Sequence, residues 1–227
     1  TKLEALGEFL RGQGIRVPWR DNPEPKDFEV VALEARGRPD EHLIMAVLLR
    51  SQSLAVYQPG NEGHFGLALD AYTHFTSPIR RYPDLLVHRA IHHWLSLQKH
   101  AQFSYNADMM AEMCARCSFT SRRAEEAERD VIDRLKCAYL ENHVGEAFEG
   151  MVSGVTSFGL FVELDYGRIS GLVHVTGRPK DYYHFDPVAH RMKGERRGQV
   201  FQLSDRVTVK VLQVNLDERK IDFELVE

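Results

Sequence analysis

The periodicity of the chain changes near residue 144, and this change limits the folds that the sequence can adopt. Before it, apolar residues recur with helical spacing; after it, they alternate with polar residues as in half-buried strands. Five short alternating segments follow, separated by turn residues: 148–155, 160–164, 171–175, 207–214 and 221–226. Such a series predicts a small, closed or nearly closed five-stranded barrel of the OB type. We therefore divide the chain into domains 1–143 and 144–227.

The first domain is predicted to be mostly helical. Apolar stripes and end signals predict helices at 1–11, 27–36, 39–50, 83–97 and 106–142. Two short runs, 54–57 and 65–71, lack the helical period, and we expect them to form two strands of one sheet with a loop between them. The expected fold class is therefore α+β, with a helical and strand portion followed by the barrel.

The composition restricts the ligands and the compartment. The 29 basic and 33 acidic residues give a net charge of −4, so any anion site must be local. Three cysteines are too few for a disulfide framework and predict a reducing compartment, so we expect a cytoplasmic protein. No apolar run approaches the about 20 residues that span a bilayer, and we expect no membrane partner. The chain begins with Thr1 instead of Met, which suggests a fragment or a processed product.

One stretch, residues 63–84, concentrates residue types that bind anions. It contains two adjacent arginines, two prolines, two histidines and four aromatic residues. Arg80 and Arg81 lie just before Pro83, which suits the first turn of a helix because proline has no N–H to leave unpaired. The helix N-terminus and two guanidiniums together favour a phosphate at this point. The alternative is that both arginines pair with acidic neighbours such as Asp84 on a solvated surface.

The barrel segment offers a second kind of nucleic-acid contact. Phe158, Phe161 and His174 could present flat rings on one exposed face, where each stacked base contributes about 1–3 kcal/mol. The alternative is that these rings belong to the barrel core. The long connection 176–206 carries seven basic and four acidic residues, which makes it the most basic part of the chain. It either contacts nucleic acid or is a solvated loop.

The run H-F-G-L-A-L-D-A-Y-T-H-F-T-S-P-I-R-R-Y-P-D-L-L-V-H-R-A-I, residues 64–91, resembles the C-terminal signature of the RNB catalytic domain. That domain belongs to the exoribonuclease family of RNase II and RNase R. The segment from Gly145 resembles the S1 domain, an RNA-binding OB fold, and the order of the two is most similar to the bacterial RNase R branch. The resemblance covers essentially the whole chain. It implies the end of an RNB domain plus an S1 domain, with the rest of the RNB domain and upstream cold-shock-like domains as partners.

The resemblance implies a processive, hydrolytic 3′→5′ exoribonuclease that degrades RNA to nucleoside 5′-monophosphates. Its substrate would be single-stranded RNA or structured RNA with a 3′ overhang. The implied cofactor is Mg²⁺, which that family holds with an upstream aspartate cluster. Because no such cluster precedes Gly63 here, we expect no metal ligand in this chain and no activity of the isolated fragment. The alternative is a non-catalytic module that binds single-stranded RNA.

The same resemblance assigns roles to individual residues. The catalytic arginine of its S-P-x-R motif corresponds to Arg80, whose guanidinium would stabilise negative charge on the phosphate during cleavage. The remaining assignments are two arginines expected to contact backbone phosphates and three rings expected to stack on bases: Arg81, Arg89, Phe158, Phe161 and His174.

Overall fold

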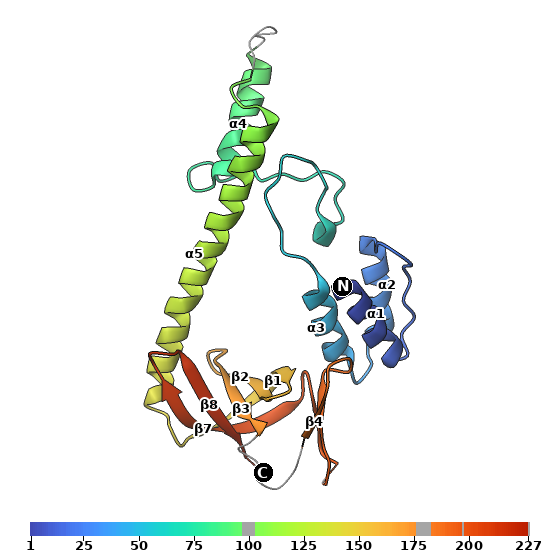
Figure 1. Cartoon of the computed structure of the whole chain (residues 1–227), viewed down its shortest axis with the longest axis vertical. Helices are drawn as coiled ribbons and strands as arrows, with labels where there is room; N and C mark the ends of the chain where they lie inside the picture. The colour runs from blue at the N-terminus through green and yellow to red at the C-terminus, as the bar shows by residue number, and fades with distance from the viewer. Residues whose placement is uncertain (97–102, 176–182, 197, 227) are drawn as a thin grey trace. The chain divides into compact units, whose positions relative to one another are not determined.

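The computed structural model describes residues 1–96, 103–175, 183–196 and 198–226 (Figure 1). The chain divides into two compact units. One unit combines Thr1–Gln52 with Arg129–Glu227, and the other is Ser53–Glu128. No helix among the described residues combines the length and the apolar character that crossing a membrane requires.

Three short helices form the start of the first unit: α1 (Lys2–Gly12), α2 (Pro25–Ala35) and α3 (Glu41–Ser51). Thr1 caps α1 with a capping box. Its side chain accepts a hydrogen bond from the Glu4 backbone N–H, and the Glu4 side chain accepts one from the backbone nitrogen of Thr1. The apolar sides of these helices are buried, including Phe9 and Ile44. The three predicted helices are therefore confirmed, with ends displaced by at most two residues.

Five strands form the closed barrel, in the order β1 (Ala147–Thr156), β2 (Gly159–Leu164), β3 (Ser170–His174), β8 (Lys220–Leu225) and β7 (Arg206–Asn215). The pair β3–β8 is parallel and the other neighbouring pairs are antiparallel. Alternate residues such as Val162, Val209 and Phe223 are buried inside. Gly171 is required by this packing, because a Cβ there would lie 2.4 Å from the Phe223 ring. The predicted α+β fold with a five-stranded barrel is confirmed.

The long connection between β3 and β7 is not simply a loop. It contains a three-stranded antiparallel sheet of β4 (Tyr183–Asp186), β5 (Arg191–Gly194) and β6 (Val200–Gln202). Segments of three or four residues are too short for a recognisable alternation, which explains why the sequence pattern did not reveal them. Some basic residues counted in this connection lie outside the described residues: Arg178, Lys180 and Arg197.

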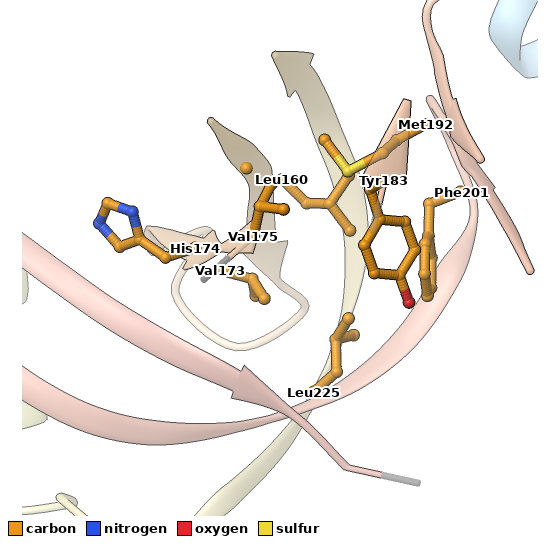
Figure 2. A pocket seen from close by; sticks show the side chains of 9 residues that line it. Leu160, Val173, His174, Val175, Tyr183, Met192, Phe201 and Leu225 are labelled. Carbon is orange, nitrogen blue, oxygen red and sulfur yellow. The ribbon is translucent and has the colours of Figure 1, made fainter. Parts of the chain in front are cut away.

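The inserted sheet covers one side of the barrel with apolar side chains. Figure 2 shows Tyr183, Met192 and Phe201 opposite Leu160 and Leu225 of the barrel. The space enclosed between them is about 10 Å³, which holds at most about one water molecule. This pocket is a packing gap and is too small for a nucleotide.

The second unit contains α4 (Tyr82–Leu95) and the N-terminal part of α5 (Ala107–Glu141), drawn in green in Figure 1. Both helices were predicted. Residues 53–81, all of which the structure describes, form no β-strand. This corrects our prediction of two strands at 54–57 and 65–71. In their place lie a short 3-10 helix, η1 (Phe65–Leu67), and one isolated bridge between His64 and Leu69.

The backbone conformation of this segment explains the correction. Ala68 has a left-handed φ of 53°, and a Cβ at Gly63 (φ 70°) would lie 2.3 Å from the Leu69 carbonyl oxygen. The chain therefore reverses tightly here, at a position that needs glycine. Leu54 and Val56 are 78% and 52% exposed, so their apolar alternation does not mark a strand face that packs on a core.

Candidate nucleic-acid interface

The turn that carries Arg80 is closed by hydrogen bonds from its own backbone. The carbonyl oxygen of Ser77 accepts from the backbone N–H groups of Arg80, at 3.2 Å, and Arg81, at 2.9 Å. Pro78, Ile79 and Arg80 form the bend between them, directly before α4. The Arg80 side chain is exposed, and no described residue forms a hydrogen bond or an ion pair with its guanidinium. This guanidinium is therefore available to an anion in solution.

Arg81 is placed differently from its neighbour. Its Nη2 donates to Oδ1 of Asp84 at 2.7 Å, and a weaker contact of 3.4 Å reaches Thr76 Oγ1. The alternative interpretation, an ion pair with Asp84, is thus correct for Arg81, but the carboxylate is fully buried instead of solvated. The role of Arg81 in RNA binding stays a prediction.

The buried carboxylate of Asp84 is held in its ionised form. Burial by itself would raise its pKa, but the backbone N–H of Ser77, 2.8 Å from Oδ1, and the Arg81 guanidinium outweigh burial. The pKa of Asp84 therefore lies below its usual value. A negative charge beneath the turn fixes Ser77 and Arg81 together.

Arg89 lies on α4 among phenol groups. Its Nη1 is 2.6 Å from the hydroxyl of Tyr105 and 3.3 Å from that of Tyr82, and its guanidinium carbon is 5.7 Å from the centre of the Tyr82 ring. The side chain is exposed, and a guanidinium has five N–H donors. Donors therefore remain for a phosphate, and the phosphate contact of Arg89 stays a prediction.

His88, next to Arg89, has a structural role that the sequence did not reveal. Its ring is stacked on Phe75 at 4.2 Å and 12°, and Nε2 lies 2.9 Å from the Phe75 carbonyl oxygen. These contacts join α4 to the segment that leads into the Ser77–Arg81 turn. The only sequence signal was the presence of both residues in the signature.

The fit of a magnesium ion can be tested on the residues present. The described ranges bring together no group of three or more His, Cys, Asp or Glu side chains that could hold a metal ion. Asp84, the acidic residue nearest the turn in sequence, is buried and bound by Arg81. The described residues do not by themselves fit a magnesium site, and we derive no chemical step through one.

The three rings predicted to stack on bases lie on the outside of the barrel; they are called the aromatic face below. In β2, Leu160 and Val162 point into the core, so Phe161 between them faces outward. Its ring makes an edge contact with Phe158 at 6.1 Å, and Phe158 is 52% exposed. The interpretation of these rings as barrel core is therefore excluded.

His174, at the end of β3, belongs to the same outer surface. Leu172 lies opposite Phe161 and His174 lies opposite Gly159 in the β2–β3 ladder, so the histidine is a diagonal neighbour of Phe161. Figure 2 shows His174 directed away from the apolar pocket. The structure thus brings the three predicted rings together on one surface.

Two further residues shape the aromatic face, and the sequence analysis missed both. A Cβ at Gly154 would be 3.3 Å from the Phe161 ring, so this ring lies across the glycine. Asp222 on β8 places Oδ1 3.8 Å from Nε2 of His174. Strand periodicity could have placed Asp222 on the outer surface, but only the β3–β8 pairing shows that it lies beside His174.

Two family models match the chain: the RNB domain over residues 3–97 and the S1 RNA binding domain over residues 141–225. Our division at residue 143 stays a prediction. Ribonuclease R of Vibrio cholerae is 48% identical over 235 residues, which cover 100% of this chain and 29% of that protein. The chain thus spans under a third of this curated relative.

Solved structures give the same result. The apo form of Mycoplasma genitalium RNase R has a TM-score of 0.84 and 27% identity, and the alignment covers 99% of this chain and 36% of that one. The same enzyme in complex with ribose-methylated single-stranded RNA has a TM-score of 0.82 and 28% identity, with 99% and 36% covered. The chain therefore belongs to the RNB family of ribonucleases, within which it is similar along its whole length to ribonuclease R.

Proposed function

We propose that this chain contributes the charge-stabilising arginine and an RNA-binding surface to a processive, hydrolytic 3′→5′ exoribonuclease that releases nucleoside 5′-monophosphates. One observation carries the proposal. The Arg80 guanidinium is exposed on a hydrogen-bonded turn and has no partner among the described residues, while the adjacent Arg81 is engaged internally. The similarity to ribonuclease R supports this reaction class.

The role of Arg80 follows from the charge that develops during phosphodiester cleavage. Attack on phosphorus increases the negative charge on the non-bridging oxygens, and a guanidinium donates two parallel hydrogen bonds to such oxygens. A donor that is positioned in advance stabilises the transition state more than the ground state. Arg80 therefore acts on the rate more than on RNA affinity. Arg89, together with the donors of Arg81 that Asp84 does not use, binds neighbouring backbone phosphates.

The aromatic face binds unpaired bases. Phe158, Phe161 and His174 stack on successive bases of single-stranded RNA or of the 3′ overhang of a structured RNA, with little sequence preference because every base has a π face. The solved complex of a related RNase R with single-stranded RNA supports this substrate class.

Magnesium is the cofactor of the proposed reaction, with ligands outside this chain, in the rest of the RNB domain. That domain and cold-shock-like domains are the proposed covalent partners. The chain alone then binds RNA without cleaving it. A cytoplasmic location is part of the proposal, and three free cysteines support it. Burial raises the pKa of each of these thiols.

A labelled-RNA assay tests this function and its alternative, a non-catalytic RNA-binding module. Below, the parent protein means the product of the complete reading frame that encodes this chain. With magnesium, the parent should release mononucleotides from the 3′ end of 5′-labelled RNA, whereas the chain alone should only retard the RNA on a gel. If the parent also retards the RNA without cleaving it, the result would favour the non-catalytic RNA-binding module. Mononucleotide release by the purified chain would overturn its assignment as inactive.

Arg80→Ala in the parent tests the role of the guanidinium. We expect the rate at saturating RNA to fall by about 10²–10³-fold, as for removal of other preorganised charge-stabilising donors, with RNA affinity within about twofold. The matched control is Arg20→Ala, because Arg20 is an exposed arginine of the other compact unit. Equal losses of affinity and rate would mean that Arg80 only holds substrate.

A further inference from the structure

Asp84 is the one charged side chain buried in the core among the described residues, with 0% of its surface exposed. A buried carboxylate is strongly unfavourable unless hydrogen bonds and an opposite charge compensate it. Here Oδ1 accepts from the Ser77 N–H at 2.8 Å and from Arg81 Nη2 at 2.7 Å. Nothing in the proposed reaction uses this residue directly, so its burial requires a separate explanation.

The bonds of Asp84 converge on the residue that closes the Arg80 turn. Ser77 donates its N–H to Asp84 and accepts the N–H groups of Arg80 and Arg81 at its carbonyl oxygen. The carboxylate is therefore two hydrogen bonds away from the Arg80 backbone. Side-chain packing does not replace this link, because Ile79 in the middle of the turn is 101% exposed. The conformation of the turn depends on polar contacts.

Asp84 also gives the two adjacent arginines different roles. It neutralises Arg81 beneath the turn, at a side chain that is 26% exposed, while Arg80 keeps its full positive charge in solvent. Without this ion pair, two equivalent guanidiniums would compete for one phosphate. The arrangement leaves Arg80 as the one guanidinium of this pair that is free to bind the scissile phosphate.

A second oxygen of Asp84 extends the network. Oδ2 is buried and has no hydrogen-bond partner among the described residues, and Nδ1 of His74 lies 3.9 Å from it. The same Nδ1 lies 3.2 Å from the hydroxyl of Tyr57. The carboxylate is thus enclosed on one side by Arg81 and Ser77 and on the other by His74.

We propose that Asp84 is a positioning residue for Arg80: it holds Ser77 and Arg81 so that the turn presents the Arg80 guanidinium in one orientation to the scissile phosphate. This inference rests on the proposed function of Arg80. Asp84 itself, being buried, does not touch RNA. Its effect is transmitted through the Ser77 backbone, and its charge is required because a neutral side chain would leave the partly buried Arg81 guanidinium without an opposite charge.

Asp84→Asn is the decisive variant, because it retains the shape and one acceptor oxygen while removing the charge. The matched control is Asp108→Asn, since Asp108 is also an aspartate in a first helical turn, that of α5, but is exposed. Hydrogen exchange of the Ser77, Arg80 and Arg81 amides in this chain reports on the turn without any need for activity. We expect exchange at these amides to be at least about tenfold faster in Asp84→Asn and unchanged in Asp108→Asn.

A double-mutant cycle in the parent protein then measures the link to Arg80. Asp84→Asn should lower the rate at saturating RNA by about 10- to 100-fold, since a small displacement of a catalytic group is costly, with RNA affinity in EDTA within about twofold. In the Arg80→Ala background the same substitution should change the residual rate by less than about twofold. A merely structural role would reduce the rate by the same factor in both backgrounds.

The outcomes separate this inference from the proposed function. Unchanged amide exchange, or equal rate losses in both backgrounds, would overturn the positioning role. Faster amide exchange with an unchanged rate would also overturn it. If the parent cleaves no RNA, the proposed function fails and the role of Asp84 toward a scissile phosphate fails with it, while the exchange data still decide whether Asp84 anchors the turn.

Discussion

The Ser77–Arg81 turn and the aromatic face position their side chains by different physical means. In the turn, a buried charge and a few hydrogen bonds determine where Arg80 lies, and Ile79 has no contact with the core. On the barrel, the register of β2 against β3 places Phe161, and buried neighbours such as Leu160 fix that register. A geometry held by a few polar contacts is sensitive to single substitutions. A geometry held by many apolar contacts is less sensitive, because no single contact determines it.

The first prediction tests whether the turn depends on one charge. Asp84→Ala should reduce the free energy of unfolding by about 3 kcal/mol, because it leaves the Ser77 N–H and the partly exposed Arg81 guanidinium without their acceptor. Urea denaturation of the chain followed by circular dichroism measures the loss. The comparison fails if Asp84→Ala costs no more than the same change at the exposed Asp108.

The second prediction tests the barrel packing. Gly171→Ala should lower the free energy of unfolding by about 1–3 kcal/mol, since the new methyl group would lie 2.4 Å from the Phe223 ring and force it to move. Thermal denaturation compares this variant with Gly12→Ala, where a Cβ would meet no atom within 4 Å. An equal stability of the two variants would show that the barrel accommodates the change by relaxation.

The third prediction separates packing from binding on the aromatic face. Phe161→Ala should weaken binding of single-stranded RNA by about 1–3 kcal/mol, the contribution of one stacked base, and leave hydrolysis of dinucleotides by the parent nearly intact. Fluorescence anisotropy with a labelled oligonucleotide measures the affinity. Phe119→Ala is the control, because Phe119 is 57% exposed and lies on α5. Unchanged affinity in Phe161→Ala would assign that ring to packing alone.

The fourth and smallest effect concerns pH. The pKa of His190 lies below its usual value, first because of burial and then because of the nearby Arg50 charge. The unfolded chain therefore binds the proton more tightly, and stability should fall as pH drops below about 6.5 and level off under the folded pKa. His190→Asn should reduce this slope in urea titrations, and asparagine tolerates the left-handed φ of 48° found there. If the pH slope of His190→Asn equals that of the unsubstituted chain or of the control His42→Asn, His190 does not cause the loss of stability.

Asp84 should act in a different pH range. Because its folded pKa is lowered, its contribution to stability is present above the unfolded value of about 3.9 and is lost as pH falls through the folded value. The two pH ranges therefore distinguish the turn from the contact between His190 and Phe9, whose rings are 5.7 Å apart.

Strands and helices with a clear period were predicted well, and segments without one were not. The barrel strands were correct to within one residue at each end, as for β7 at 206–215 against a prediction of 207–214. The prediction of strands at 54–57 and 65–71 was wrong, because the apolar residues of this tight loop alternate with polar ones by chance. The strands β4 to β6 were missed because each is shorter than the pattern needed to detect it.

The sequence by itself determined the order of helices and barrel strands along the chain and the concentration of arginines before α4, because these depend on local spacing. The family was indicated by the resemblance of residues 64–91 to the RNB signature. Only the tertiary structure decided that Arg81 pairs with a buried Asp84 while Arg80 stays free, and that Gly154 and Asp222 adjoin Phe161 and His174. Burial and pairing depend on which parts of the chain meet in space. Two adjacent arginines are identical in the sequence and differ only through these contacts.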